Sequence, residues 1–113
     1  MYHYNAKIIR WIDGDTFEAV VDLGFFVSYR ASFRVRGIDT PEITGATKVA
    51  GKAAKDHAEM IVPSGSTVPI TTHKPDKYGR WLADITVLSG DGIWSGDFAA
   101  MMIASNFAVP SKG

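Results

Sequence analysis

Apolar and polar positions alternate along much of the chain, and short runs of turn residues interrupt the alternation. Residues 6–12 and 16–23 are both rich in β-branched and aromatic side chains. Asp13 and Gly14 lie between them and are a strong signal for a two-residue turn. The pattern therefore predicts that the chain begins with a β-hairpin.

Three further strands are expected in the rest of the chain. Residues 30–38 alternate well enough for a third strand, in which Gly37 marks a bulge or bend. Residues 67–72 and 81–88 read as the fourth and fifth strands. Pro69 has no N–H to donate, so the fourth strand is predicted to be an edge strand or to contain a bulge.

Two segments have apolar residues at helical spacing. Residues 51–62 are rich in Ala and Lys and are followed by Pro63, which closes the segment. Residues 94–105 form the second candidate, and Asn106 after them tolerates the left-handed conformation that ends helices. This order of elements predicts an α+β, mainly β, fold: a five-stranded OB-fold barrel with two flanking helices.

Composition limits the chain to one globular unit. Its 113 residues are 46% hydrophobic and 21% charged, with neither a linker nor an internal repeat, so there is room for one core. We therefore expect a single domain over residues 1–113. No cysteine is present, which excludes disulfides, thiolate metal sites and cysteine nucleophiles.

Charge and targeting signals give weaker guidance. Twelve Lys and Arg balance twelve Asp and Glu, whereas a nucleic-acid partner usually shows as a basic surplus. The first residues lack the basic start and apolar stretch of a secretory signal, and no segment approaches the ~20 apolar residues of a membrane span. We expect a cytoplasmic protein without membrane association, or a secreted one if a leader has been removed.

Three polar clusters carry candidate chemistry: DGDT at residues 13–16, RVRGIDTPE at 34–42 and DKYGR at 76–80. Each has a structural interpretation by itself, as a hairpin turn, a helix start or tight turn, and a solvated loop, respectively. Together they supply two short carboxylates, one longer carboxylate and two guanidinium groups. That combination matches phosphodiester hydrolysis.

The two short carboxylates are candidate metal ligands. Asp15 and Asp39 offer compact oxygen donors for a hard divalent cation, and the carbonyl oxygen of Thr40 lies beside them. Such a site leaves positions for water and a phosphate oxygen. Few protein ligands imply modest affinity and favour calcium.

The longer side chains have separate candidate roles. Arg34 and Arg80 can accept the charge that builds on phosphate oxygens, because a guanidinium donates two parallel hydrogen bonds where a lysine cannot. Glu42 has the reach to act on an attacking water as a general base or an orienting acceptor.

In order and spacing, DGDT, FRVRGIDTPE, a helix and DKYGRWLADI resemble the staphylococcal nuclease (thermonuclease) family, over residues 6 to about 109. The resemblance implies an OB-type barrel and calcium-dependent endonuclease and exonuclease cleavage of DNA and RNA that releases 3′-phosphate products. It implies calcium ligands at Asp15, Asp39 and the Thr40 carbonyl, and catalytic side chains at Arg34, Glu42 and Arg80.

The same resemblance implies that Lys77 and Tyr78 bind substrate near the nucleotide's terminal phosphate. Other polar residues are expected to be structural or surface residues: Asp13, Arg36, His3, His57 and His73. The chain also departs from the family. Its segment ITGATKVA is shorter than the family's flexible loop, and its C-terminus is short, without the tyrosines and third helix found there.

The expected partners are DNA, RNA or both, with single strands preferred, and the expected oligomeric state is a monomer. The main alternative is a non-catalytic OB-type module that binds nucleic acid or protein. A calcium-binding structural protein is a third interpretation. Non-catalytic members of the family lose the carboxylates or the arginines, whereas all five positions are filled here, so the sequence favours the nuclease.

Overall fold

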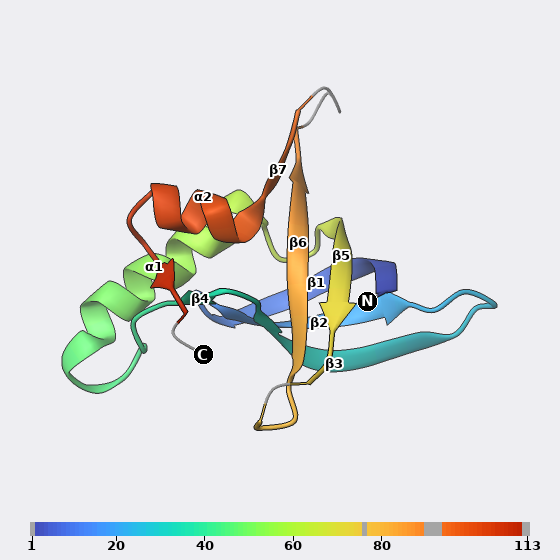
Figure 1. Ribbon diagram of the computed structural model, residues 1–113, viewed down its shortest axis with the longest axis horizontal. Helices are drawn as coiled ribbons and strands as arrows, with labels where there is room; N and C mark the ends of the chain where they lie inside the picture. Colours follow the sequence, from blue (N-terminus) through green and yellow to red (C-terminus); the bar gives the residue numbers. More distant parts are fainter. Residues whose placement is uncertain (1, 76, 90–93, 112–113) are drawn as a thin grey trace.

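The computed structural model describes residues 2–75, 77–89 and 94–111 (Figure 1). Its long strands are β1 (Tyr2–Asp13), β2 (Thr16–Asp22), β3 (Ser28–Val35), β5 (Thr67–His73) and β6 (Trp81–Leu88). The short strands are β4 (Ile38–Asp39), β7 (Ser95–Asp97) and β8 (Val109–Pro110). The helical elements are the 3₁₀ turn η1 (Gly45–Thr47) and the helices α1 (Lys48–Ile61) and α2 (Phe98–Ala104).

The five long strands close into a mixed barrel. Neighbours pair in the order β3-β2-β1-β5-β6, and β3 also pairs with β6. That closing pair is parallel and brings Phe33 opposite Trp81 and Arg34 opposite Leu82. All other pairs of long strands are antiparallel. The predicted five-stranded OB-type barrel with two helices is therefore confirmed.

Alternation along the strands fills the barrel with apolar side chains. In β2, Phe17, Ala19 and Val21 are buried while the residues between them are not. Phe17 stacks on Phe33 with ring centroids 5.4 Å apart. Burying a large apolar side chain stabilises a fold by roughly 1.5–3 kcal/mol, so this interior holds the strands that carry the polar clusters.

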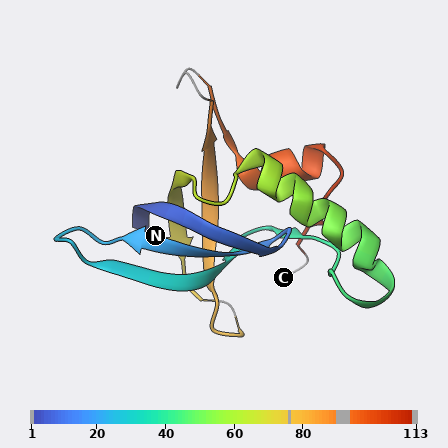
Figure 2. The same ribbon diagram turned by 180° about the vertical axis from the view of Figure 1, so that it is seen from behind.

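Both helices lie together on one side of the barrel, in the front and back views alike (Figures 1 and 2). The face of α1 that is buried consists of small residues, Gly51, Ala54 and Ala58, which allow a close approach to the barrel. The longest helix of the described residues has 14 residues, and no helix in this part of the chain is long and apolar enough to cross a membrane.

Several predicted boundaries change. The hairpin is confirmed, but Asp13 pairs with Thr16, so its turn is Gly14–Asp15 and not Asp13–Gly14. The second helix does not begin at residue 94, because residues 95–97 pair with β6 and the Asp97 side chain accepts a hydrogen bond from Ala100 N that caps α2. Asn106 has a φ of 64°, as expected of a residue that ends a helix.

The prediction of an edge strand or a bulge at Pro69 is wrong, because β5 is not an edge strand and its register with β1 is continuous through Pro69. It lies between β1 and β6. Pro69 pairs with Asn5 of β1, whereas pairing with β6 begins one residue later, at Ile70. A proline is tolerated here since the ladder on its other side has not yet begun.

Candidate active site

The turn between β1 and β2 presents Asp15 to the interior of the molecule. Its backbone N–H donates to Asp13 Oδ1 at 3.1 Å, and its carbonyl accepts from Val35 N at 2.8 Å. The Asp15 side chain is only 7% exposed. Because the turn is bonded to the end of β3, the carboxylate is held in a fixed position.

Arg34 joins the two carboxylates that were predicted to bind metal. Its Nη1 donates to Asp15 Oδ2 at 3.0 Å, and its Nη2 donates both to Asp39 Oδ1 and, at 3.0 Å, to Ile38 O. The side chain of Arg34 is 19% exposed and that of Asp39 is 45% exposed. The guanidinium thus forms a bridge between the β1–β2 turn and β4.

Hydrogen bonds and charge give the two acids of the DGDT turn, Asp13 and Asp15, different pKa values. Burial raises the pKa of Asp13 to about 6, and the neighbouring Asp15 adds to this increase. Burial also acts to raise the pKa of Asp15, but hydrogen bonds from Asp13 and Thr40 N and the charge of Arg34 outweigh it and lower that pKa. Asp15 therefore stays ionised to a lower pH than Asp13.

The short strand β4 owes its position to the C-terminal segment. Ile38 pairs with Pro110 and Asp39 with Val109, and Ser111 N donates to Gly37 O at 2.9 Å. Residues 109–111 thus fix the strand carrying Asp39. The sequence offers only a weak signal for this role, because the strand concerned, β8, has only two residues.

Two glycines set the packing around the site: Gly14, which the sequence marked only as a turn residue, and Gly51, which was not singled out. A Cβ on Gly14 would lie 3.0 Å from Thr40 Cγ2 and 3.0 Å from Ala54 Cβ, and a Cβ on Gly51 would lie 2.2 Å from Glu42 O. The backbone at residue 42 therefore rests directly on α1. For Gly51, the signal available in the sequence was a glycine within a helical segment. Glycine destabilises a helix, so its presence there indicates a packing requirement.

A groove of about 590 Å³ opens beside Arg34. Its charged and aromatic lining combines β3, β4 and the loop between β5 and β6: Arg34, Arg36, Asp39, Lys77, Tyr78 and Arg80. Lys77 Nζ and the Arg80 guanidinium lie 5.3 and 5.4 Å from the centre of the Tyr78 ring. The third sequence cluster thus meets the second, although its first residue, Asp76, lies outside the described residues.

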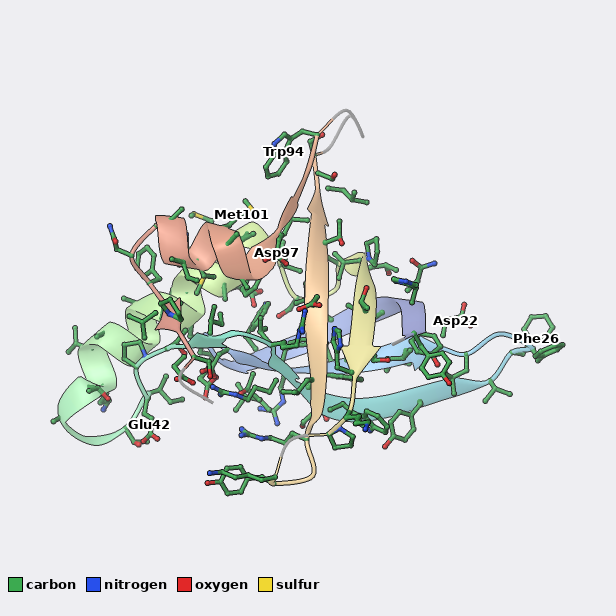
Figure 3. The ribbon with its side chains drawn as sticks, viewed as in Figure 1. Asp22, Phe26, Glu42, Trp94, Asp97 and Met101 are labelled. Atoms are coloured by element: carbon green, nitrogen blue, oxygen red, sulfur yellow. The ribbon has the colours of Figure 1, made fainter. Side chains whose placement is uncertain are left out.

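Glu42 is the one predicted catalytic side chain that does not line this groove. It is exposed on the loop that leads into α1 (Figure 3). Its carbonyl accepts a hydrogen bond from Thr47 Oγ1 at 2.9 Å. The structure therefore fixes the backbone of this residue more firmly than its carboxylate.

The residues expected to be structural make contacts of that kind. Arg36 Nη2 donates to Asp84 Oδ2 at 3.1 Å, and His73 Nε2 lies 2.8 Å from the same oxygen. The His57 ring stacks on Phe107 at 4.1 Å between centroids. Arg36 also lines the groove, which its assignment as a surface residue did not foresee.

The donor set fits a hard cation that takes few protein ligands. In the described part of the chain, no three His, Cys, Asp or Glu side chains form a metal-binding group. Two carboxylates nevertheless meet at one guanidinium. Thr40 Oγ1 beside them is buried without a hydrogen-bond partner among the described residues. Oxygen donors of this kind suit calcium.

Comparison with known proteins agrees with these features. A family model described as staphylococcal nuclease homologue matches residues 32–111. The match includes the end of β3 with Arg34, β4 and the loop that carries Arg80, whereas the turn with Asp15 precedes it. No curated protein matches the chain.

Proposed function

Because the chain belongs to the family of staphylococcal nuclease homologues, we propose that it is a calcium-dependent nuclease that hydrolyses phosphodiester bonds of DNA and RNA. Membership itself gives a nuclease-type or nucleic-acid-binding function. The calcium-dependent nuclease activity is inferred chiefly from one observation: Arg34 bridges Asp15 and Asp39 at the edge of a cationic groove.

In this proposal the groove binds the phosphate from two sides. Arg34 on β3 and Arg80 on the β5–β6 loop both line it, and their guanidinium groups donate to the phosphate oxygens on which negative charge increases during attack. Lys77 and Tyr78 lie on the same loop as Arg80 and bind a neighbouring phosphate. The chain therefore supplies positive charge where the transition state needs it.

Asp15, Asp39 and the Thr40 carbonyl would hold the calcium ion, which supplies a positive charge next to a phosphate oxygen. The lowered pKa of Asp15 keeps that carboxylate ionised for this role. Arg34 contacts both carboxylates, so its guanidinium must exchange one of these contacts for a phosphate oxygen when substrate binds.

The proposed reaction is water attack with loss of the 5′-oxygen. A water oxygen forms a bond to phosphorus, Glu42 accepts the proton of that water, and the bond from phosphorus to the 5′-oxygen breaks. The 5′-oxygen leaves and takes a proton from solvent water, and the phosphate stays on the 3′-oxygen. Because Glu42 is exposed outside the groove, its side chain must turn toward the groove when substrate binds.

We expect single strands to be better substrates, because a groove in one small barrel suits an extended strand. One chain lines the whole groove, so the predicted monomer would be sufficient for activity. A radius of gyration of 13.6 Å supports treating residues 1–113 as one domain, since a compact domain of about 100 residues has roughly 13 Å.

A non-catalytic binding module is the second candidate. The exposed position of Glu42 and the pairing of both carboxylates with Arg34 favour it, because such a groove could bind a phosphate backbone without activating water. The nuclease remains the stronger proposal since every side chain that the chemistry needs is present.

One assay separates the two functions. Denatured DNA and RNA are incubated with wild type, Glu42→Ala and Arg80→Ala, with calcium or with chelator, and the ends of the products are identified. We expect 3′-phosphate ends, and loss of cleavage in chelator and in both variants. Undiminished cleavage in chelator or in both variants would contradict the mechanism. Binding by wild type without cleavage, with any divalent ion, would identify a binding module.

A further inference from the structure

At the end of the barrel away from the helices, β2 and β3 project as a two-stranded finger, residues 22–28 (Figures 1 and 3). Pairing of β1 with β2 stops at Ala6 and Val21, so the finger extends beyond its neighbour. Phe26 lies at its tip (Figure 3). Phe25 is 98% exposed and Phe26 is fully exposed.

The backbone of the tip makes this choice of residues unusual. Val27 N donates to Gly24 O at 2.8 Å, and the two central residues, Phe25 and Phe26, have φ values of 55° and 61°. Turns with positive φ at both central positions favour Asn and Gly, because a side chain such as Phe is strained there. Folding of the hairpin therefore gives no reason for a Phe-Phe pair.

An apolar pocket lies at the base of the same finger. It has a volume of about 220 Å³ and is lined by Tyr2, Tyr4, Val21, Leu23, Tyr29, Phe33, Thr72 and Trp81. A cavity of roughly 150 Å³ is large enough for a benzene molecule. The pocket thus has room for one phenyl ring, and residues of the finger itself form part of its wall.

One edge of β3 is also open. Pairing with β6 begins at Phe33, so residues 28–32 of β3 pair only with β2 among the described residues. An open edge can pair with another strand, and an antiparallel pair of two identical edges has two-fold symmetry. Arg30 on this segment contacts Glu18 at 3.2 Å, so its charge is balanced within one chain.

We propose that the finger binds a second copy of this chain, with the Phe25–Phe26 tip of each copy in the apolar pocket of the other. Tip and pocket lie on the same end of one molecule, so a two-fold axis lets each copy give a phenyl ring and receive one. The open edges of β3 pair across the axis. A second copy is the occupant because this chain itself carries both the projecting rings and the pocket for them.

The decisive variant is Phe25→Asn combined with Phe26→Gly. It removes both rings and gives the turn the residues that its backbone prefers, so the variant should unfold at the same or a higher temperature than wild type at concentrations where both are monomeric. In sedimentation equilibrium without nucleic acid, we expect wild type to approach twice the chain mass of 12.3 kDa. The double variant should raise the dimer dissociation constant at least about 30-fold.

Two single variants complete the test. Tyr2→Ser removes a pocket wall and should weaken the dimer about fivefold, whereas Val49→Asn, on an exposed position of α1, should leave it unchanged. A wild type that stays monomeric at every concentration overturns the proposal, as does a double variant that dimerises like wild type. Binding of a monomer to lipid vesicles or oligonucleotides through Phe25 and Phe26 would also overturn it and would assign the finger to that partner.

Discussion

Strand β3 supplies one arginine to each of two ionic clusters of opposite design. In the first, one cation, Arg34, joins two acids, Asp15 and Asp39. In the second, one acid, Glu18, joins two cations, Arg10 and Arg30. Asp15 and Arg34 are largely buried, whereas the side chains of Arg10 and Arg30 are 63% and 61% exposed.

The difference shows which arrangement can perform chemistry. A buried ion pair is weakly screened and held in one geometry, while an exposed pair is screened by water and salt and contributes little. Arg34 and Asp39 of the first cluster also line the groove, together with the loop that carries Arg80. Two arginines of the same strand therefore differ in role: Arg34 belongs to a candidate catalytic group, whereas Arg30 belongs to an exposed surface cluster.

Removing the central cation should have the largest effect. Arg34→Ala leaves Asp15 buried without its charged partner, so we expect the free energy of unfolding in chelator to fall by about 3–5 kcal/mol. Loss of a phosphate-binding guanidinium should lower the cleavage rate by about 10²–10³. Urea unfolding and initial cleavage rates measure the two effects. The matched control, Arg30→Ala on the same strand, should change neither appreciably, and equal losses would erase the contrast between the clusters.

Across the groove, Arg80→Lys should separate activity from stability. Lysine keeps the charge but cannot donate two parallel hydrogen bonds to a phosphate, so we expect cleavage to fall about 100-fold. The free energy of unfolding should stay within about 0.5 kcal/mol of wild type. Lys74→Ala in the same loop is the control. Cleavage at the wild-type rate by the Arg80 variant would remove Arg80 from the phosphate site.

Gly51→Ala tests how α1 supports the loop with Glu42. An added Cβ would lie 2.2 Å from Glu42 O, so the helix and loop must separate. We expect the free energy of unfolding to fall by about 1–3 kcal/mol, although alanine is normally the better helix residue by about 1 kcal/mol. Thermal unfolding measures the change, with Lys52→Ala as the control. Stabilisation by Gly51→Ala would show that this contact is unimportant.

The smallest effect is expected for Glu18→Gln, in the exposed cluster. Hydrogen bonds from Arg30 and Arg10 lower the pKa of Glu18, so its ionised form stabilises the folded state above the unfolded-state pKa. That contribution is lost as the pH falls through the lower, folded-state pKa. Urea midpoints of variant and wild type should differ slightly at neutral pH and coincide in acid or high salt. A difference that grows in acid would contradict this sign.

Local patterns were sufficient to predict most of the fold. The alternation in residues 16–23 and the polar turn before them predict the first hairpin, because side chains on a strand point to opposite faces in turn. Boundaries were less accurate where a distant partner decides them. Residues 95–97 pair with β6 instead of joining α2, and Pro69 lies within the barrel because its neighbour β6 begins pairing one residue later.

For the candidate site, the functional side chains could be predicted from the sequence, but their partners could not. Spacing and resemblance named Asp15, Arg34 and Asp39, and the fold brings these three together. They did not reveal that β8 holds Asp39 in place, or that Gly51 lets α1 touch the loop of Glu42. These contacts join segments far apart in the chain, so no local pattern records them.

The sequence by itself determined the strand and helix types, the inward-facing core positions and the inventory of acids and guanidinium groups, because these follow from residue chemistry and short-range periodicity. Only the tertiary structure decided which charges are buried and which meet. Closure of the barrel by β3 and β6 brings Arg34 opposite Leu82 and so places the second and third clusters on one groove. The energy of a charge depends on its surroundings, and only the folded chain provides them.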